Sequence, residues 1–178
     1  TLESSSAASD VYKRQEKPLL DLNGKSLIER VYLRAIQSNA KEVFIATDSK
    51  KIEDHVKNFS SNVILTSKEH ESGTDRVHEC ATKLHISDDM VIVNVQGDEP
   101  FIDPETINKT ADIILKNKNA SVGSACTLFK DNDFKDPNNV KVYLSDSNRA
   151  INFLRNVDPV DLPKNKAKYF QHVGLSLI

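Results

Sequence analysis

The sequence predicts an α/β fold with a mainly parallel sheet and antiparallel additions after about residue 120. Up to that point, short apolar runs alternate with segments whose apolar residues recur at helical spacing. This alternation is typical of βαβ units, whose helices cover both faces of a parallel sheet. Later in the chain, three apolar runs follow one another without helical segments between them, which indicates antiparallel pairing. These runs are Ser121–Phe129, Val140–Leu144 and Ala150–Leu154.

The bulk composition limits the class of protein. The chain has 178 residues, enough for one domain, and its 38% hydrophobic and 28% charged residues are ordinary for a soluble globular protein. A net charge of −2 argues against a nucleic-acid partner, and no apolar run approaches the roughly 20 residues that span a membrane. Cys80 and Cys126 show neither metal-ligand spacing nor a disulfide framework, which favours buried, reduced thiols in a cytoplasmic protein.

The two ends of the chain differ from the rest. Residues 1–15 are small and polar, without a helical or strand period, and resemble translated adapter sequence. We therefore expect a non-native leader over 1–15, a truncated domain over 16–175, and a tail 176–178 of similar origin to the leader. Resequencing of the source DNA that found one uninterrupted natural reading frame across both junctions would contradict this expectation.

Cap residues mark the expected helix starts. Ser26-Leu27-Ile28-Glu29 matches a capping box and opens a helix to about residue 39. Asp103-Pro104 pairs a cap residue with proline at the first helical position and predicts a helix to about residue 116. Further helices are predicted over about 50–59 and after the polar loop 66–73.

Three apolar runs in the first part of the chain predict strands. They are Val43–Ala46, Val63–Leu65 and Met90–Val95, and the last has so little polar alternation that we expect it inside a parallel sheet. Gly24-Lys25-Ser26 resembles the end of a P-loop, but the glycine that this motif needs five residues earlier is Leu19. We therefore interpret Asn23-Gly24 as a turn. The stretch Asp158–Lys168 is rich in proline and lysine and predicts a surface loop.

The segment Gln96-Gly97-Asp98-Glu99-Pro100 is the first candidate site. It follows the most hydrophobic strand, and ligands of open α/β sheets bind beyond the carboxyl ends of strands. A carboxylate there suits Mg²⁺, which proteins hold with one or two carboxylates plus substrate phosphates. The residues alone give equal weight to a second interpretation, in which the segment is only a tight turn.

Three weaker signals fall on neighbouring loops. His70 to Arg76 leads into a helix N-terminus, which favours anions, but Ser72 as a plain helix cap beside a solvated arginine explains the same residues. Asp48 ends a strand and either contacts a nucleotide or caps the following helix. Lys17 precedes the first helix, where a lone lysine is usually a solvated charge. Together these residues place polar groups along one rim of one sheet.

Taken in order, these motifs resemble 3-deoxy-manno-octulosonate (Kdo) cytidylyltransferase, the CMP-Kdo synthetase family. The resemblance is carried by KPL with NGK, ATD, ESGTDR and VIVNVQGDEP, and continues through NVKV, FLR and HVG, over about 160 residues. It implies a Rossmann-like three-layer nucleotidyltransferase fold and a cytoplasmic enzyme that makes CMP-Kdo and pyrophosphate from CTP and an acidic sugar for lipopolysaccharide synthesis. CMP-sialate and amino-Kdo cytidylyltransferases, or a non-catalytic nucleotide-binding remnant, are the alternatives.

The resemblance also implies roles for individual residues. Lys17 and Asp98 are the implied catalytic pair, with Lys17 closing a phosphate-binding loop and Asp98 holding Mg²⁺. The implied nucleotide-binding residues are Lys17, Asp48, Ser72, Gly73, Thr74 and Arg76. The implied sugar-binding residues are Gln96, Arg155 and His172, where an arginine suits a carboxylate.

Two departures from the family pattern bear on activity. The family has a strand and an arginine- and glycine-containing loop before Lys17, and it continues well beyond His172 to a second metal-binding aspartate. We therefore expect the chain as written to be a poor or inactive enzyme, and pyrophosphate release by the purified chain would contradict this. The family is typically dimeric, and the region after residue 120 is where we expect that contact.

Overall fold

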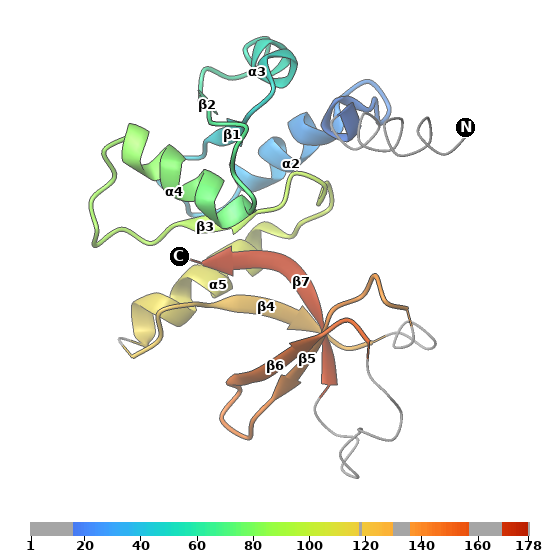
Figure 1. The fold of residues 1–178 in the computed structure, drawn as a ribbon, viewed down its shortest axis with the longest axis vertical. Coiled ribbons are helices and arrows are strands. Elements are labelled where there is room, and N and C mark those ends of the chain that lie inside the picture. Colours follow the sequence, from blue (N-terminus) through green and yellow to red (C-terminus); the bar gives the residue numbers. More distant parts are fainter. Residues whose placement is uncertain (1–15, 118, 130–135, 157–168, 178) are drawn as a thin grey trace. The chain divides into compact units, whose positions relative to one another are not determined.

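The computed structural model describes residues 16–117, 119–129, 136–156 and 169–177. The described residues from Glu16 to Gly123 belong to one compact unit, and Ser124–Ser176 make up a second (Figure 1). The predicted leader over 1–15 and the predicted loop Asp158–Lys168 lie outside the described residues.

The first unit alternates helices with short strands. A parallel pair joins β1 to β2, with Ile45 opposite Val63. Helix α3 contacts both of these strands and α4 contacts β1, while α5 contacts β3 and α2 (Figure 1). None of the helices in the described part of the chain is long and apolar enough to cross a bilayer. The elements are η1 (Lys17–Leu19), α2 (Leu27–Ala35), β1 (Ile45–Thr47), α3 (Lys50–Val56), β2 (Val63–Leu65), α4 (Gly73–Lys83), β3 (Val93–Val95) and α5 (Pro104–Lys116).

An aliphatic cluster between α2, α3 and the parallel pair forms the core of this unit. Val56 of α3 is completely buried, and burial of each such side chain contributes about 1.5–3 kcal/mol relative to exposure. Tyr32 and Phe59 flank the cluster with ring centroids 5.8 Å apart. The buried members are Ile28, Ile45, Ile52, Val56 and Val63.

Local sequence signals set the helix starts as expected. The Ser26 hydroxyl accepts a hydrogen bond from the Glu29 amide at 3.2 Å, although the Glu29 carboxylate pairs with Lys25. Asn23 and Gly24 have φ values of 58° and 81°, which a tight turn with two left-handed residues requires. This supports the turn interpretation of Asn23-Gly24 over a P-loop. Asp103 and Pro104 open α5, which ends at Lys116 as predicted.

Two predicted helices end earlier than expected. Helix α2 stops at Ala35 instead of about residue 39 because the amides of Gln37 and Ser38 bond carbonyls only three residues back. The Ser38 hydroxyl also donates to the Ala35 carbonyl at 2.7 Å, which satisfies the helix end. Helix α3 likewise ends at Val56 instead of about residue 59.

The prediction of a fully buried strand over Met90–Val95 is wrong in length and in burial. Only Val93–Val95 is extended, and its residues are partly exposed. The Met90 amide donates to the Ser87 carbonyl at 3.0 Å, so Met90 closes a turn, and it is 47% exposed. Strand β1 is shifted in the same way, to Ile45–Thr47 from the predicted Val43–Ala46.

The second unit contains β4 (Ser124–Thr127), β5 (Lys141–Leu144), β6 (Ala150–Leu154) and β7 (Tyr169–Leu177). Strand β7 pairs with β4 and β5, and β5 pairs with β6, all antiparallel. The antiparallel additions after residue 120 are therefore confirmed. Ser145 and Asn148 form the turn between β5 and β6, with Asn148 at φ 57°.

The two cysteines differ in their surroundings. Both thiols are free, as expected, and Cys80 is buried in α4, where burial raises the pKa of its thiol. Cys126 is exposed on β4, so the prediction that both thiols are buried is wrong for this residue. Cys126 and Thr127 are the last two residues of the short strand β4, and both are exposed because the end of this strand is left uncovered.

Candidate functional site

The parallel pair of strands brings two predicted loops to one edge of the first unit. Ile45 lies opposite Val63, so the carboxyl ends of β1 and β2 coincide. The Thr66 amide donates to the Thr47 carbonyl at 2.8 Å, which continues the ladder just past both strands. Asp48 and Thr66 therefore begin their loops side by side, at the edge where ligands of α/β sheets bind.

Arg76 ties these two loops to α4. Its guanidinium donates to Asp48 Oδ2 at 2.8 Å and to Thr66 Oγ1 at 2.6 Å, and it also reaches the Ser67 carbonyl. The Arg76 side chain is 21% exposed, so the alternative of a solvated arginine is wrong. Asp48 does not cap the following helix either, because the hydroxyl of Ser49 caps α3.

The N-terminus of α4 carries the predicted Ser-Gly-Thr segment. Ser72 is the helix cap, and its hydroxyl accepts from the Asp75 amide at 3.2 Å and donates to the Asp75 carboxylate at 2.6 Å. Gly73 and Thr74 are exposed. A Cβ at Gly73 would lie 3.9 Å from the side-chain amide of Asn94, so this helix end faces β3. The dipole and amides of the first turn favour an anion there.

The segment after β3 forms a turn that carries the predicted metal ligand. The Glu99 amide donates to the Gln96 carbonyl at 3.2 Å, with Gly97 and Asp98 between them. Gly97 does not need a left-handed φ here, and a Cβ at this position would meet Ile28 Cδ1 at 3.4 Å. The segment is therefore a tight turn, and this turn holds Asp98 on the surface beyond the strand.

Lys17 and Asp98 meet across 81 residues of sequence. Lys17 Nζ lies 2.9 Å from Asp98 Oδ2, and the side chains are 53% and 51% exposed. An ion pair this exposed contributes only about 0–1 kcal/mol, so a charged ligand can replace either partner at low cost. Burial, with the Asp98 charge as the next cause, raises the pKa of the neighbouring Glu99.

The donor set at this turn fits a cation that shares its ligands with a substrate. The described residues contain no cluster of three His, Cys, Asp or Glu side chains that could form a complete protein cage. Asp98 is half exposed, and Glu99 follows it in the same turn. One or two carboxylates with open positions are the protein share of a Mg²⁺ site completed by phosphates.

Glu79 is a residue of this region that sequence reasoning missed. Its carboxylate accepts from the Ser67 amide at 2.8 Å, contacts the His70 ring, and pairs with Lys83 at 2.7 Å. Lys83, the Ser67 amide and His70 together lower the pKa of Glu79 to about 2. Glu79 thus fixes the loop before α4, and its four-residue spacing from Lys83 was the available signal.

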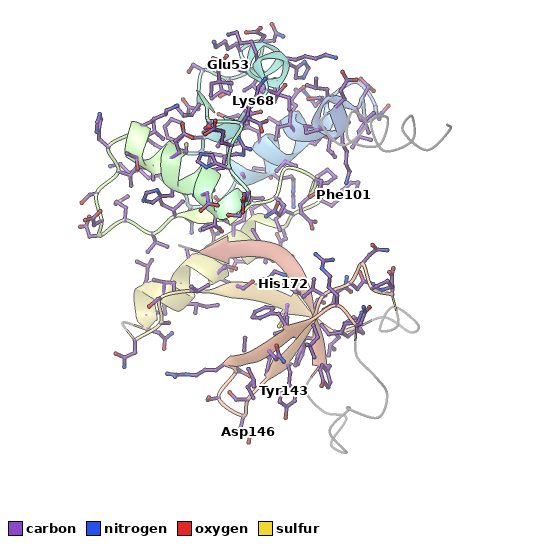
Figure 2. The ribbon with its side chains drawn as sticks, in the orientation of Figure 1. Glu53, Lys68, Phe101, Tyr143, Asp146 and His172 are labelled. Atoms are coloured by element: carbon purple, nitrogen blue, oxygen red, sulfur yellow. The ribbon has the colours of Figure 1, made fainter. Side chains whose placement is uncertain are left out.

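The predicted sugar-binding residues fall in both units. Gln96 is exposed in the turn of the first unit, whereas Arg155 belongs to the second unit. His172 also belongs to the second unit (Figure 2). Within the second unit, the register brings Arg155 and His172 to one level. Lys141 of β5 lies opposite Leu154 and Gln171, so the next residues along, Arg155 and His172, flank Val140 on either side. The two backbones are then about 10 Å apart, two strand spacings.

His172 is held in a defined orientation on β7. Its Nε2 lies 2.7 Å from the Ser124 hydroxyl, which donates to the Leu175 carbonyl, so the ring nitrogen is the donor to Ser124. The ring also packs edge-on against Phe153 at 5.4 Å. Burial lowers the pKa of His172, partly opposed by a backbone hydrogen bond to Leu175, so the ring is neutral at neutral pH.

The fold and this edge of charged side chains are those of an α/β protein whose ligand edge lies beyond the carboxyl ends of its strands. The chain belongs to the cytidylyltransferase family, whose family model matches residues 14–176.

Two curated relatives narrow the resemblance within that family. A 3-deoxy-manno-octulosonate cytidylyltransferase of Francisella tularensis subsp. tularensis is 40% identical over 166 residues, which are 89% of this chain and 66% of that protein. A protein with the same description from Hahella chejuensis is 41% identical over 140 residues, 78% of this chain and 55% of that one. The predicted resemblance is confirmed, and the chain spans just under two thirds of the length of the Francisella relative.

Solved structures agree with the predicted fold. The structure of a CMP:2-keto-3-deoxy-manno-octonic acid synthetase complexed with CTP is similar with a TM-score of 0.80 and 35% identity, over 90% of this chain and 66% of that one. A 4-diphosphocytidyl-2C-methyl-D-erythritol synthase, 13% identical with a TM-score of 0.55, shares the fold. The predicted Rossmann-like nucleotidyltransferase fold is therefore confirmed.

Proposed function

We propose that the protein transfers the cytidylyl group of CTP to Kdo, giving CMP-Kdo and pyrophosphate. The observation that carries this proposal is the Lys17–Asp98 pair, 2.9 Å apart beyond the carboxyl end of β3. It is the predicted catalytic pair, and a family member similar in structure was solved in complex with CTP. The alternatives of a CMP-sialate or amino-Kdo cytidylyltransferase concern the sugar and leave the nucleotide chemistry unchanged.

CTP would occupy the edge formed by the loops after β1, β2 and β3. Lys17 would leave Asp98 and neutralise the triphosphate, which the weakness of an exposed ion pair allows. The first-turn amides of α4, at Gly73 and Thr74, offer donors to phosphate or ribose oxygens. Arg76 and Asp48 would contact the nucleotide from the position that their mutual ion pair already fixes.

Asp98 would hold Mg²⁺, with Glu99 as the adjacent carboxylate. When bound, the ion neutralises phosphate oxygens and lowers the pKa of an attacking hydroxyl. Asp98 is exposed, whereas Glu99 is partly buried. Asp98 is thus the more accessible ligand of the two.

The sugar acid would bind where Arg155 and His172 share one level of the second sheet. Arg155 supplies a cation for the carboxylate of the sugar acid. His172 is neutral and oriented by Ser124, so it presents a fixed ring to sugar hydroxyls without a charge. Gln96, in the turn of the first unit that carries Asp98, stays a predicted sugar-binding residue.

The reaction is an in-line displacement at phosphorus. The anomeric hydroxyl of Kdo forms a bond to the α-phosphorus of CTP, the bond to the β-phosphate bridging oxygen breaks, and the hydroxyl proton is lost as pyrophosphate leaves. Transfers of this kind depend on positioning and on charge neutralisation more than on covalent chemistry. Lys17 stabilises charge on the leaving pyrophosphate, while Arg155 orients the nucleophile.

Pyrophosphate release tests the proposal. The complete product of the gene and the 178-residue chain are assayed in parallel with CTP, Mg²⁺ and Kdo. We expect the complete gene product to release pyrophosphate only with both substrates, and the 178-residue chain to release little or none. Competition at constant CTP separates Kdo from sialate and amino-Kdo. CTP binding without turnover of any acidic sugar by the complete gene product would instead favour a non-catalytic nucleotide-binding protein.

We also propose that the protein is a cytoplasmic homodimer whose contact uses the antiparallel strands. Strand β6 pairs only with β5 among the strands of the described residues. Ile151 and Phe153 on β6 are 59% and 49% exposed, and an apolar edge of this kind favours pairing with a second copy. Light scattering should give twice the chain mass, and an Ile151→Lys variant should elute as a monomer.

A further inference from the structure

Lys141 is the least expected buried residue of the second unit. It is 1% exposed, although lysine is almost never fully buried without partners. Its ammonium donates to the backbone carbonyls of Asp136, Asn139 and Arg155, the last two at 2.8 and 2.9 Å. An ammonium has three protons, and these three carbonyls match them. Burying a charge costs free energy unless hydrogen bonds compensate it. The buried ammonium of Lys141 therefore indicates a specific role for this side chain.

The carbonyls that Lys141 holds belong to segments far apart in the sequence. Asp136 and Asn139 lie in the turn before β5, and Arg155 lies just after β6, 14 residues from Lys141. Asn139 extends the same network to β7, because its side-chain oxygen accepts from the Gln171 amide at 3.0 Å. One buried side chain therefore ties the backbone just before β5 to the backbone just after β6, and Asn139 adds a side-chain bond to β7.

Those strand ends carry the proposed sugar-acid residues. Arg155 gives its carbonyl to Lys141, while the backbone of His172 donates to the carbonyl of Val140, next to Lys141, at 2.8 Å. Arg155 follows Leu154, the last residue of β6. The bond from Lys141 to the Arg155 carbonyl continues the register past the end of the strand and helps to hold Arg155 at the level of His172.

We propose that Lys141 is a positioning residue of the sugar-acid site, which fixes the backbone of Arg155 from the interior without touching the substrate. This rests on the proposed function, because Arg155 is the cation proposed for the sugar carboxylate. Loss of the ammonium removes the donor shared by the three carbonyls, and the Arg155 segment then moves. The nucleotide residues of the first unit make no hydrogen bond to Lys141 in the described part of the chain.

Calorimetric titrations of Lys141→Met with Kdo and with CTP test this role. Methionine keeps the volume and the apolar stem, and removes the ammonium. We expect Kdo affinity to fall about tenfold or more, because small displacements of a positioning group are costly. CTP affinity should change less than about twofold, because the three carbonyls that Lys141 bonds all belong to the second unit. If Lys141→Met does not fold, Lys141→Gln, which keeps two donors, is used in the same way.

The matched control is Val142→Ala, on the same strand. Val142 is 3% exposed, so its truncation destabilises the second unit without removing a bond to Arg155. Equal losses of Kdo affinity in Lys141→Met and Val142→Ala would overturn the proposal, because they would reduce the effect to lost stability. Loss of CTP and Kdo affinity together in Lys141→Met would overturn it too.

Hydrogen exchange separates this proposal from the proposed function. In Lys141→Met, amides of 153–156 should exchange faster than in Val142→Ala at matched stability, whether or not Kdo binds. A wild-type protein that does not bind Kdo contradicts the proposed function, and unchanged exchange at 153–156 contradicts the role of Lys141 independently. Faster exchange with unchanged Kdo affinity would also contradict the role at the sugar site.

Discussion

The two units of the molecule hold their charged side chains in different ways. In the first, Lys17 and Asp98 pair on the surface with about half of each side chain exposed. In the second, Lys141 is buried and bonded to backbone carbonyls. A surface pair is weak and exchanges its partner for a ligand, whereas a buried, satisfied ammonium is costly to disturb. Lysine thus has two roles in this molecule. Lys17 is placed to exchange its partner for a ligand, whereas Lys141 fixes the backbone of the second unit.

The same contrast extends to the other charged groups. Arg76 in the first unit bonds side chains of two loops, Asp48 and Thr66, which a ligand can displace. His172 in the second is fixed by Ser124 and by the ring of Phe153. Phe101, which follows the turn after β3, is 87% exposed (Figure 2). The segment next to Asp98 is therefore open to solvent.

Asp98→Asn should have the largest effect, and it tests whether the exposed pair of the first unit binds a ligand. Removing the charge that attracts Mg²⁺ should lower kcat about 10²-fold or more in the complete gene product. The fold should be intact, because the carboxylate belongs to an exposed pair. Steady-state pyrophosphate release measures the rate. Asp112→Asn, at an exposed pair on α5, is the control and should have normal activity.

Removal of the charge should affect mainly stability at Lys141 and mainly CTP binding at Lys17. Lys141→Met should lower the free energy of unfolding by about 3 kcal/mol, since it removes three hydrogen bonds from a buried ammonium to backbone carbonyls. Lys17→Met should change the free energy of unfolding by less than about 0.5 kcal/mol while raising KM for CTP. Urea unfolding monitored by circular dichroism compares them. Equal stability losses in the two variants would end the distinction between an exchangeable and a structural lysine.

Arg76→Lys tests the role of Arg76 at the proposed CTP-binding edge. Lysine keeps the charge but loses the planar fork that reaches Asp48 and Thr66 at once. We expect KM for CTP to rise about tenfold with a smaller change in KM for Kdo, because one bond of the fork is worth about 1–1.5 kcal/mol. Arg149→Lys, in the β5–β6 turn, is the matched control. A selective effect of Arg76→Lys on Kdo would contradict the assignment.

The smallest expected effect is a difference in acid sensitivity between the units. The pKa of His172 is lowered from 6.5, so the unfolded chain binds a proton first and stability is lost as pH falls below about 6.5. The pKa of Glu79 is lowered from 4.5 to about 2, so its contribution is present above pH 4.5 and lost between 4.5 and about 2. The free energy of unfolding of each variant is measured across pH. His172→Gln should lack only the loss of stability below about pH 6.5, and Glu79→Gln should lack only the loss between pH 4.5 and about 2.

Much of the fold could be predicted because local rules agreed with tertiary packing. Val63–Leu65 and the start of α5 at Pro104 were correct, since a bounded apolar run and a cap with proline leave few alternatives. Met90 shows where this stops. Its hydrophobicity favoured a strand. In the structure, its amide donates a hydrogen bond to the Ser87 carbonyl in a turn, and its side chain is exposed. Neither feature can be predicted from the local pattern.

The candidate site divides in the same way. Motif order predicted that Lys17 and Asp98 act together, and the structure brings them within 2.9 Å. Asp48 as a helix cap was a sound local alternative, but Ser49 took that position, which left Asp48 for Arg76. Lys141 could not be predicted, because its partners are backbone carbonyls that any residue would supply. Only the folded arrangement of the strand ends identifies it.

The most direct measurement is a crystal structure of the protein with CTP and Mn²⁺ in place of Mg²⁺, using the anomalous signal of manganese. The account predicts a manganese peak on the Asp98 carboxylate, bridged to phosphate oxygens, with Lys17 moved from Asp98 to the triphosphate. A nucleotide bound elsewhere, or a manganese peak remote from Asp98 with the Lys17–Asp98 pair still closed, would contradict it.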